Sequence, residues 1–304
     1  MAENIDVSII IVNWNAKNLL KKCIDSIIMK ENRMKYEIIV IDNNSNDGSR
    51  DLCEHNYANS VRLIKNRQNR GFAAANNQGI KESKGKFILL LNSDTEVLDN
   101  ALDKCFEYIS SHKDIGLIGC RLLNSDGTLQ YSCYNFNSIL RSIIFKIGAA
   151  KIIRSDKRYK YEGLITSADY DSLMDVDYVC GAFMMFRREI IDKIGLLDER
   201  FFMYAEEADY CARIKNAGYR IAYFPEASVI HHGGGSSKSI SVLSENRRII
   251  SRLLFIKKHK GNLYFNVYRF FSILVAAANI ISGDEDRRSR GRSKLKAILK
   301  LKYE

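Results

Sequence analysis

The N-terminal third of the chain alternates between short apolar runs and segments in which apolar residues recur at helical spacing. Each run predicts a strand, and the first and last of them, Val7 to Val12 and Phe87 to Leu91, are expected to be buried; Phe87 to Leu91 is too short for a buried helix and should be covered on both faces. The runs are Val7 to Val12, Glu37 to Ile41, Val61 to Ile64 and Phe87 to Leu91. Strand, helix and strand within about forty residues predict a βαβ unit with parallel strands.

Polar segments follow three of these predicted strands. The carboxyl ends of parallel strands meet at one edge of a sheet, where ligands bind in open α/β folds. We therefore expect the side chains at these strand ends to surround one ligand. They are Asn13 and Asn15 after the first strand, Asp42 and Asn44 after the second, and Asn92, Ser93 and Asp94 after the fourth.

Two carboxylates at this edge have specific candidate roles. Asp42 can accept a hydrogen bond from the imide N–H of a pyrimidine base, while the residues after it favour a turn and a helix N-cap from Ser45 or Asp47. Asp94 is placed to meet a ligand through a metal ion, or it only caps a following helix. Both interpretations of Asp94 stay open on the tripeptide alone.

A further candidate lies after the third predicted strand, where Arg70 and Gly71 precede a helix of small residues that contains Asn76. This arrangement allows the backbone and Arg70 to approach a diphosphate closely. No GxGxxG motif follows the first strand and no GxxxxGK[ST] motif is present. The sequence therefore favours a nucleotide site that is neither a Rossmann nor a P-loop site.

The second half offers an acidic helix start and a pair of histidines. Val176 to Arg187 is a predicted strand in which Gly181 and Ala182 indicate either a bulge or a wall that admits an acceptor. Phe201 to Gly218 is a predicted helix with Glu206, Glu207 and Asp209 near its start, as the helix dipole favours. His231, His232 and a run of glycines follow the predicted strand Ala227 to Ile230. Tyr131 to Asp175 shows no clear period, which indicates a solvated excursion.

The last segment differs from the rest in composition. Arg247 to Lys260 is basic and amphipathic, Phe270 to Ser282 is apolar and uncharged, and the residues from Arg287 onward are rich in Arg and Lys. The apolar run is short for a bilayer span and follows Arg269. We expect an interfacial helix or a helix docked on the protein rather than a transmembrane one.

Composition narrows the class of protein. The 304 residues are 46% hydrophobic, which is ample for a packed core, and the formal charge of +11 indicates an anionic partner. The seven cysteines form no CxxC pair, so we expect core thiols in a reducing compartment, without zinc or disulfides. The N-terminus lacks the features of a signal peptide, so we expect a cytoplasmic protein.

Several segments together resemble family 2 glycosyltransferases, in particular the bacterial rhamnosyltransferase-like and galactofuranosyltransferase-like group. The resemblance covers about residues 6–237 and rests on these segments: VSIIIVNWN, EIIVIDNNSNDGS, NRGFAAANNQGI, FILLLNSD, VDYVCGAFMMFRR, LLDERFFMYAEEADYCARIKNAGY and ASVIHHGGGSS. The family usually has Asn-Pro-Asp or Asp-x-Asp where this chain has Asn92-Ser93-Asp94.

The resemblance implies an α/β GT-A fold, a mostly parallel central sheet flanked by helices, with a C-terminal helical appendage. The implied catalytic domain covers residues 1–240, with a nucleotide-sugar half to about residue 95 and an acceptor half from 96. Residues 241–304 would form the basic, partly apolar tail.

The resemblance also implies roles for the residues singled out above. Glu207 would be the general base, with Glu206 and Asp209 orienting the helix start, and Gly181, Ala182 and Glu206 would lie on the acceptor side. Asp94 and His231 would bind Mg²⁺ or Mn²⁺, and Ser236 and Ser237 would belong to a flap over the donor. The nucleotide-sugar site would contain Asn13, Asn15, Asp42, Asn44, Arg70, Gly71, Asn76, Asn92 and Ser93.

The expected activity is metal-dependent transfer of a hexose with inversion, from dTDP-rhamnose as first choice or a UDP-sugar as second. The acceptor would be a glycan, expected on a lipid carrier, in bacterial surface polysaccharide synthesis. The alternative is a non-catalytic protein of the same fold that binds a sugar nucleotide or a glycan. We expect the tail to hold the protein at the inner face of the cell membrane or to bind a second subunit. Nucleic acid is not an expected partner, because the basic residues concentrate in the tail.

Overall fold

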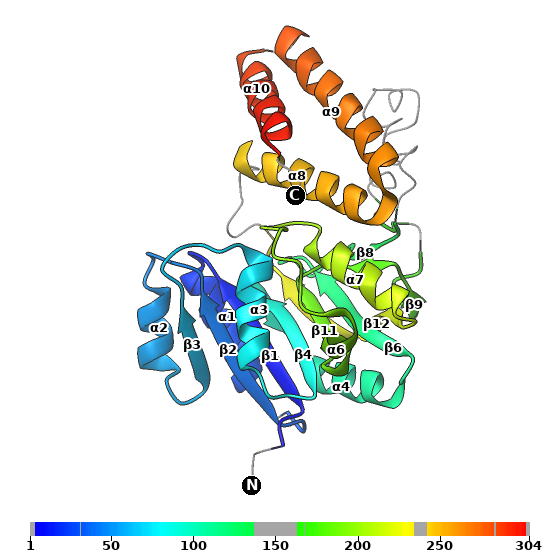
Figure 1. The fold of residues 1–304 in the computed structure, drawn as a ribbon. Coiled ribbons are helices and arrows are strands. Elements are labelled where there is room, and N and C mark those ends of the chain that lie inside the picture. Colours follow the sequence, from blue (N-terminus) through cyan, green and yellow to red (C-terminus); the bar gives the residue numbers. More distant parts are fainter. Residues whose placement is uncertain are drawn as a thin grey trace.

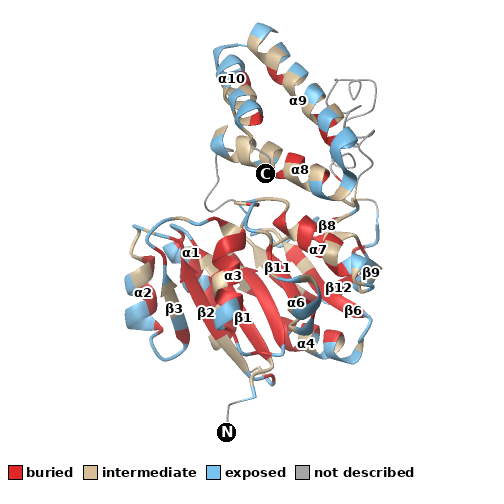
Figure 2. Cartoon of the chain, viewed as in Figure 1, coloured by how far each residue is buried: buried red, intermediate tan, exposed pale blue. Residues whose placement is uncertain are grey.

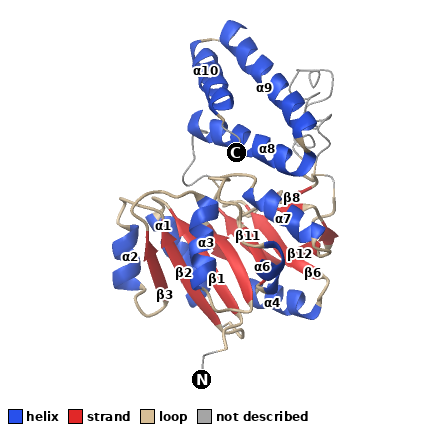
Figure 3. Cartoon of the chain, in the orientation of Figure 1, coloured by secondary structure: helices blue, strands red, loops and turns tan. Residues whose placement is uncertain are grey.

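The computed structural model describes residues 4–30, 32–136, 163–166, 168–233, 242–282 and 284–301. It consists of a sheet covered by helices, with three further helices at one end (Figures 1 and 3). Much of the predicted excursion between Tyr131 and Asp175 lies outside the described residues, as does the predicted flap containing Ser236 and Ser237.

The four predicted N-terminal strands are confirmed. They pair in the order β3-β2-β1-β4, and all four are parallel. The central residues of β1, β2 and β4 are fully buried because helices cover both faces of the sheet (Figure 2), whereas β3 at the edge is only partly buried. The strands are β1 (Val7–Asn13), β2 (Tyr36–Asp42), β3 (Val61–Lys65) and β4 (Phe87–Asn92).

The sheet continues beyond β4 with mixed strand directions. Strand β11 (Phe183–Arg187) is antiparallel to β4, and β6 (Ile115–Leu123), β12 (Arg220–His231) and β5 (Thr95–Val97) follow in that order. The edge strands β7 and β9 pair with β6 and β12, and β8 with β10 forms a separate pair. These four are Leu129–Gln130, Met174–Asp175, Cys133–Tyr134 and Tyr178–Val179. The predicted strand from Val176 to Arg187 is therefore two strands, β10 and β11, with Gly181 and Ala182 between them.

Six helices accompany the sheet in the described part of residues 4–233. They are α1 (Lys17–Ile28), α2 (Ser49–Asn56), α3 (Phe72–Glu82), α4 (Ala101–Ser111), α6 (Glu189–Ile194) and α7 (Glu206–Asn216). Two hydrophobic clusters fill the space between helices and sheet: Leu20 and Ile24 of α1 belong to one, and Tyr210 and Ile214 of α7 to the other. Six of the cysteines are buried, as expected for core thiols.

One predicted helix start is wrong. Helix α7 begins at Glu206 and not at Phe201. Tyr204 and Ala205 have φ values of 73° and 64°, in the left-handed region, so they cannot continue a right-handed helix. The residues before them form a loop over the start of α7.

The tail forms three helices, α8 (Val242–Lys260), α9 (Asn262–Ser282) and α10 (Glu285–Lys300), with α8 nearest the sheet (Figure 1). They enclose a small core of Leu253, Ile256, Phe265, Tyr268 and Ile298. Glu245 of α8 pairs with two residues of α10, Arg290 at 2.9 Å and Lys294 at 2.7 Å.

Helix α9 is longer than the predicted apolar run. Its segment Asn262–Ile281 has a mean hydropathy of 1.4, and 22% of the positions in its apolar window are buried. Among the described helices, it alone is long and apolar enough to cross a membrane, judged by length and composition.

Candidate active site

Asn13 and Asp42 lie side by side in register at the ends of β1 and β2, and both are buried. Asp42 Oδ2 accepts hydrogen bonds from Arg50 Nε at 2.6 Å and from the Ser45 backbone N–H at 3.0 Å. Asn13 Nδ2 donates to Ser45 Oγ at 3.2 Å. One oxygen of each side chain, Oδ1 in both cases, is buried without a partner. Because unpaired buried acceptors are rare, these two oxygens are candidates to receive N–H groups of a bound base.

The neighbouring asparagines shape the turn at this edge. Asn15 and Asn44 adopt left-handed φ values of 53° and 70°, which asparagine tolerates better than most residues. Asn15 Oδ1 accepts from the Asn46 backbone N–H at 2.8 Å, and Asn44 Oδ1 accepts from Arg50 Nη2 at 3.4 Å. Both side chains therefore hold the loop that presents Asp42.

The turn at Arg70 and Gly71 packs differently from the expectation. Gly71 has φ 84°, and a Cβ atom built on it would lie 2.4 Å from the carbonyl oxygen of Phe202. That oxygen accepts a hydrogen bond from the Phe72 backbone N–H at 2.7 Å. The absence of a side chain at Gly71 thus admits the loop before α7, where we expected a diphosphate. Arg70 is exposed beside it.

Two buried asparagines support this turn and its helix. Asn43 Oδ1 accepts from the Arg70 backbone N–H at 3.0 Å, and Asn43 Nδ2 donates to the Gly71 carbonyl at 3.1 Å. Asn76 Nδ2 donates to the Phe72 carbonyl at 3.0 Å within α3. Asn43 was missed in the sequence because nothing distinguishes it within a run of polar turn residues.

Asp94 lies in the turn between β4 and β5, so the interpretation of Asp94 as a helix cap is wrong. Its Oδ1 is 3.4 Å from Nε2 of His231, at the end of β12, and Asn92 Nδ2 is also 3.4 Å from that nitrogen. Burial works to raise the pKa of Asp94, but the hydrogen bond and charge of His231 hold that pKa below its usual value. Ser93 is half-buried between Asn92 and Asp94.

Gln130 fixes the orientation of the His231 ring. Its Nε2 donates to the His231 carbonyl at 3.2 Å and to Asn124 Oδ1 at 2.9 Å, which turns Oε1 toward His231 Nδ1 at 2.6 Å. The Nδ1–H of His231 thus donates to Gln130, and Nε2 is the ring nitrogen that faces Asp94. Gln130 was missed because it lies next to the segment without a clear period that begins at Tyr131.

This arrangement fits a divalent cation. Two ligands bound to one ion at about 2.1 Å each are separated by about 3 Å, close to the distance found between Asp94 and His231. Among the residues that the structure describes, no group of three or more His, Cys, Asp or Glu gathers as a metal site. His232 turns away from Asp94, since its Nε2 pairs with Glu96 at 2.6 Å and its Nδ1 with Ser125 at 2.8 Å.

Glu206 and Glu207 form the first turn of α7. One oxygen of each carboxyl, Oε2, is buried without a partner. Burial raises the pKa of both, and repulsion by Glu207 adds to the increase for Glu206. A Cβ atom on Gly181 would lie 3.8 Å from Glu207 Cβ, and the Ala182 carbonyl accepts from the Asn92 backbone N–H at 3.0 Å. The turn at Gly181 and Ala182 thus contacts both the start of α7 and the end of β4 that precedes Asp94.

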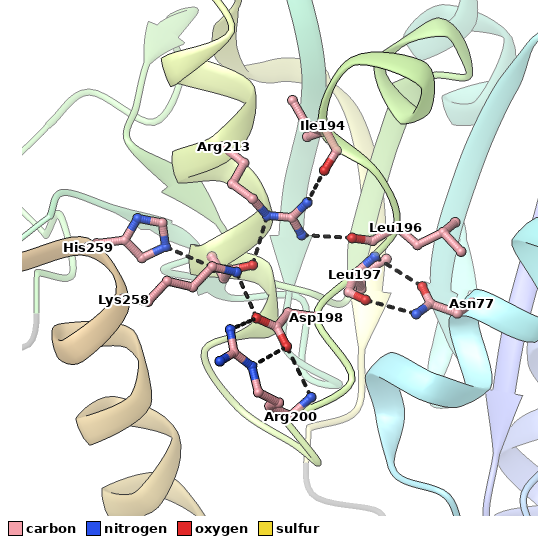
Figure 4. Close-up of polar contacts among 10 residues, drawn as sticks. Asn77, Ile194, Leu196, Leu197, Asp198, Arg200, Arg213, Lys258 and His259 are labelled. Atoms are coloured by element: carbon pink, nitrogen blue, oxygen red, sulfur yellow. Dashed lines mark hydrogen bonds and ion pairs between the residues drawn. The ribbon is translucent and has the colours of Figure 1, made fainter. Parts of the chain in front are cut away.

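Asp209 does not belong to this carboxyl pair. Its buried side chain pairs with Arg213 at 3.0 Å, with Lys258 at 2.7 Å and with His259 at 2.8 Å. Figure 4 shows these three side chains converging from α7 and α8. We expected Asp209 to orient the helix start, but it connects α7 to the tail.

The mixed, mostly parallel sheet flanked by helices is a GT-A-like fold. The model for "Glycosyl transferase family 2" matches residues 8–195, and the chain belongs to this family. The structure of GalNAc-T7 with UDP, GalNAc and Mn²⁺ has a TM-score of 0.60 over 98% of this chain and 56% of that one, at 17% identity, which shows the shared fold.

Several relatives have assigned activities, among them two that match most of this chain. The low-salt glycan biosynthesis hexosyltransferase Agl10 of Haloferax volcanii is 26% identical over 83% of this chain and 77% of its own length. An N-acetylglucosaminyl-diphospho-decaprenol L-rhamnosyltransferase of Mycobacterium tuberculosis is 26% identical over 66% of this chain and 67% of its own length. The chain spans only 25% and 18% of two longer relatives.

Proposed function

We propose that this protein transfers a sugar from a nucleotide-diphosphate donor to a hydroxyl group of a glycan acceptor, with inversion at the anomeric carbon. One observation carries the proposal. The turn at Gly181 and Ala182 contacts the start of α7, which carries Glu207, and the end of β4, next to the pair Asp94 and His231. A donor diphosphate on one side and an acceptor hydroxyl on the other would then meet at the anomeric carbon.

The proposed reaction is a single displacement. Glu207 accepts the proton of the acceptor hydroxyl as its oxygen bonds to the anomeric carbon. The bond from that carbon to the diphosphate oxygen breaks, and the nucleoside diphosphate leaves with the electron pair. The buried setting of Glu207 suits a general base, because a raised pKa brings a carboxylate closer to the operating pH.

Asp94 and His231 would hold Mg²⁺ or Mn²⁺. Such an ion would offset the negative charge that develops on the leaving diphosphate. Asp42 Oδ1 and Asn13 Oδ1, buried without partners, would receive the base of the nucleotide. The names of the relatives make dTDP-rhamnose the first donor to test and UDP-sugars the second.

A panel of nucleotide sugars tests the proposal, with Mg²⁺ or Mn²⁺ present and donor turnover as the readout. We expect turnover of one donor class and a transfer product whose anomeric configuration, read by NMR, is opposite to that of the donor. Retention of configuration would contradict the displacement at Glu207. Tight binding of a sugar nucleotide without turnover, in the presence of acceptor, would indicate the non-catalytic alternative.

We also propose that the tail lies on the inner face of the cell membrane, where a lipid-linked acceptor would be within reach. Exposed apolar side chains of α9 support this: Leu263, Tyr264, Phe270, Leu274 and Ile281. Helix α10 adds basic residues next to them, each worth about 1 kcal/mol at an anionic surface. These residues are Arg287, Arg288, Arg290, Arg292, Lys294 and Lys296, of which Arg290 and Lys294 also pair with Glu245.

Cosedimentation with vesicles tests this placement. The protein should pellet with phosphatidylglycerol vesicles at low salt and be released at high salt, because the attraction is screened. Neutral phosphatidylcholine vesicles are the control. Absence of binding to the anionic vesicles, together with a dimer that dissociates when Phe270 and Leu274 are replaced by Ser, would show that the tail binds a second subunit.

A further inference from the structure

The loop before α7 is held in an unfavourable backbone conformation. Tyr204 and Ala205 are consecutive residues with left-handed φ values, and neither is a glycine, asparagine or aspartate. Such a conformation persists only where surrounding contacts stabilise it. The next two residues are Glu206 and Glu207, so the contacts on this loop also determine where the carboxyl pair lies.

Helix α8 contacts three consecutive residues of this loop. Ser251 Oγ donates to the Met203 carbonyl at 2.9 Å. The guanidinium of Arg247 lies 4.0 Å from the ring centroid of Phe202, and that of Arg248 lies 4.7 Å from the ring centroid of Tyr204. A tail helix thus contacts the three residues, Phe202, Met203 and Tyr204, that lie just before the start of α7.

A second set of contacts holds α7 itself. Lys258 Nζ lies 2.7 Å from Asp209 Oδ1 and 2.7 Å from Asp198 Oδ2, so it joins α7 to the beginning of the loop. His259 Nε2 lies 2.8 Å from the same Asp209 oxygen, and Arg213 occupies the other (Figure 4). Asp209 is fully buried, so its charge requires these partners.

The same loop touches the donor side. The Phe202 carbonyl accepts from the Phe72 backbone N–H and contacts Gly71, next to Arg70. A shift of the loop would therefore change the carboxyl pair and the start of α3 together. Displacements of about 1 Å at such positions reduce rates by up to about a hundredfold.

From these contacts we infer that α8 is a positioning element of the active site. Lys258, His259 and Ser251 hold α7 and its preceding loop so that Glu207 faces the acceptor. The inference rests on the proposed role of Glu207 as the base. It adds that the tail, beyond any contact with a membrane, is required for the chemical step.

The test uses the full-length protein with Lys258→Met and His259→Phe, and with Lys260→Met as the matched control on the exposed end of the same helix. Assays run well below the melting temperature of each variant. We expect kcat for transfer to fall about tenfold or more for the first two variants, with nucleotide affinity within about twofold of the wild type. Lys258→Arg should restore most of kcat, since an arginine can pair with both Asp198 and Asp209. Amide hydrogen exchange in residues 199–208 should become faster in the same variants in which kcat falls.

Wild-type kcat in Lys258→Met and His259→Phe, with faster exchange in residues 199–208, would overturn the inference and leave α8 a purely stabilising element. Should Lys258→Met fail to fold, Ser251→Ala removes only the hydrogen bond to Met203 and must lower kcat without weakening nucleotide binding. Glu207→Gln separates the two proposals. If it is inactive while the α8 variants are normal, only the role of α8 is wrong; if it transfers normally, the proposed base is wrong.

Discussion

The two sides of the candidate active site are held in place by different parts of the chain. On the donor side, Asp42 is held by Arg50, eight residues further along, within one strand-to-helix connection. On the acceptor side, the helix that carries Glu207 is held through Asp209 by His259, which is 50 residues away in the tail. The donor side is thus organised by the sheet and its loops, and the acceptor side by an appended helix.

The largest loss of transfer activity is expected when the pair of Asp94 and His231 is disrupted. Asp94→Ala removes the carboxylate that faces His231, so the rate of transfer should fall about a thousandfold or more. EDTA should abolish transfer by the wild type. His231→Ala should lose activity severely, whereas His232→Ala, which alters only the pairing with Glu96 and Ser125, should keep most of it. The measurement is the initial rate of transfer with and without Mn²⁺. Full activity in EDTA would contradict the assignment of Asp94 and His231 as ligands of a required metal ion.

The next effect is on the base. Glu207→Gln keeps the shape of the side chain but cannot accept a proton, so kcat should fall by about a hundredfold or more. Glu206→Gln should retain more activity than Glu207→Gln under the same conditions. The opposite ranking in steady-state assays would assign the base to Glu206.

The sequence predicted the donor side better than the acceptor side, for physical reasons. Asn13, Asp42 and Asp94 stand at the ends of buried strands, and an apolar run with a polar end is a local pattern. The start of α7 was predicted five residues too early because Phe201 to Ala205 has a composition compatible with a helix. Contacts with Gly71, Phe72 and α8 hold those residues in a loop, and such contacts leave no local pattern.

The sequence also did not predict the partners of two further residues, Asp209 and Gln130. Asp209 sits in an acidic first turn, where a carboxylate ordinarily interacts with the helix dipole, yet its partners come from α8. Gln130 lies far in sequence from His231 and near the excursion without a period. Long-range pairing of single polar side chains is specified by tertiary packing, which periodicity does not report.

A smaller effect is expected at Gln130. Gln130→Leu removes the acceptor that holds His231 Nδ1–H, so the ring would lose its fixed orientation toward Asp94. The Mn²⁺ concentration needed for half-maximal transfer should rise about tenfold, as for other partners of metal-binding histidines. Asn124→Ala removes the acceptor for Gln130 Nε2, together with the hydrogen bonds from Asn124 to Thr128 and Leu129, and should produce a smaller rise. An unchanged Mn²⁺ requirement in Gln130→Leu would contradict this role.

The smallest effect concerns stability and pH. Burial and repulsion by Glu207 raise the pKa of Glu206 in the folded protein, so the folded state binds this proton more tightly than the unfolded state does. The free energy of unfolding should therefore decrease as the pH rises above the ordinary glutamate pKa of about 4.3. Glu206→Gln cannot ionise and should be more stable than the wild type at pH 7, by about 1 kcal/mol, with the difference vanishing near pH 4. Thermal melts across this range measure it, with the exposed Glu189→Gln as control; a destabilised Glu206→Gln at pH 7 would contradict the burial argument.

The central claim is that Asp94 acts in donor binding and Glu207 acts on the acceptor. It is tested most directly by calorimetric titration of the nucleoside diphosphate, with and without Mn²⁺, into the wild type, Asp94→Ala and Glu207→Gln. The account predicts that Mn²⁺ strengthens binding to the wild type and to Glu207→Gln equally, although Glu207→Gln does not transfer sugar. Asp94→Ala should show weak binding that Mn²⁺ no longer improves. Mn²⁺-dependent binding that survives in Asp94→Ala, or disappears in Glu207→Gln, would contradict the assignment of donor and acceptor sides.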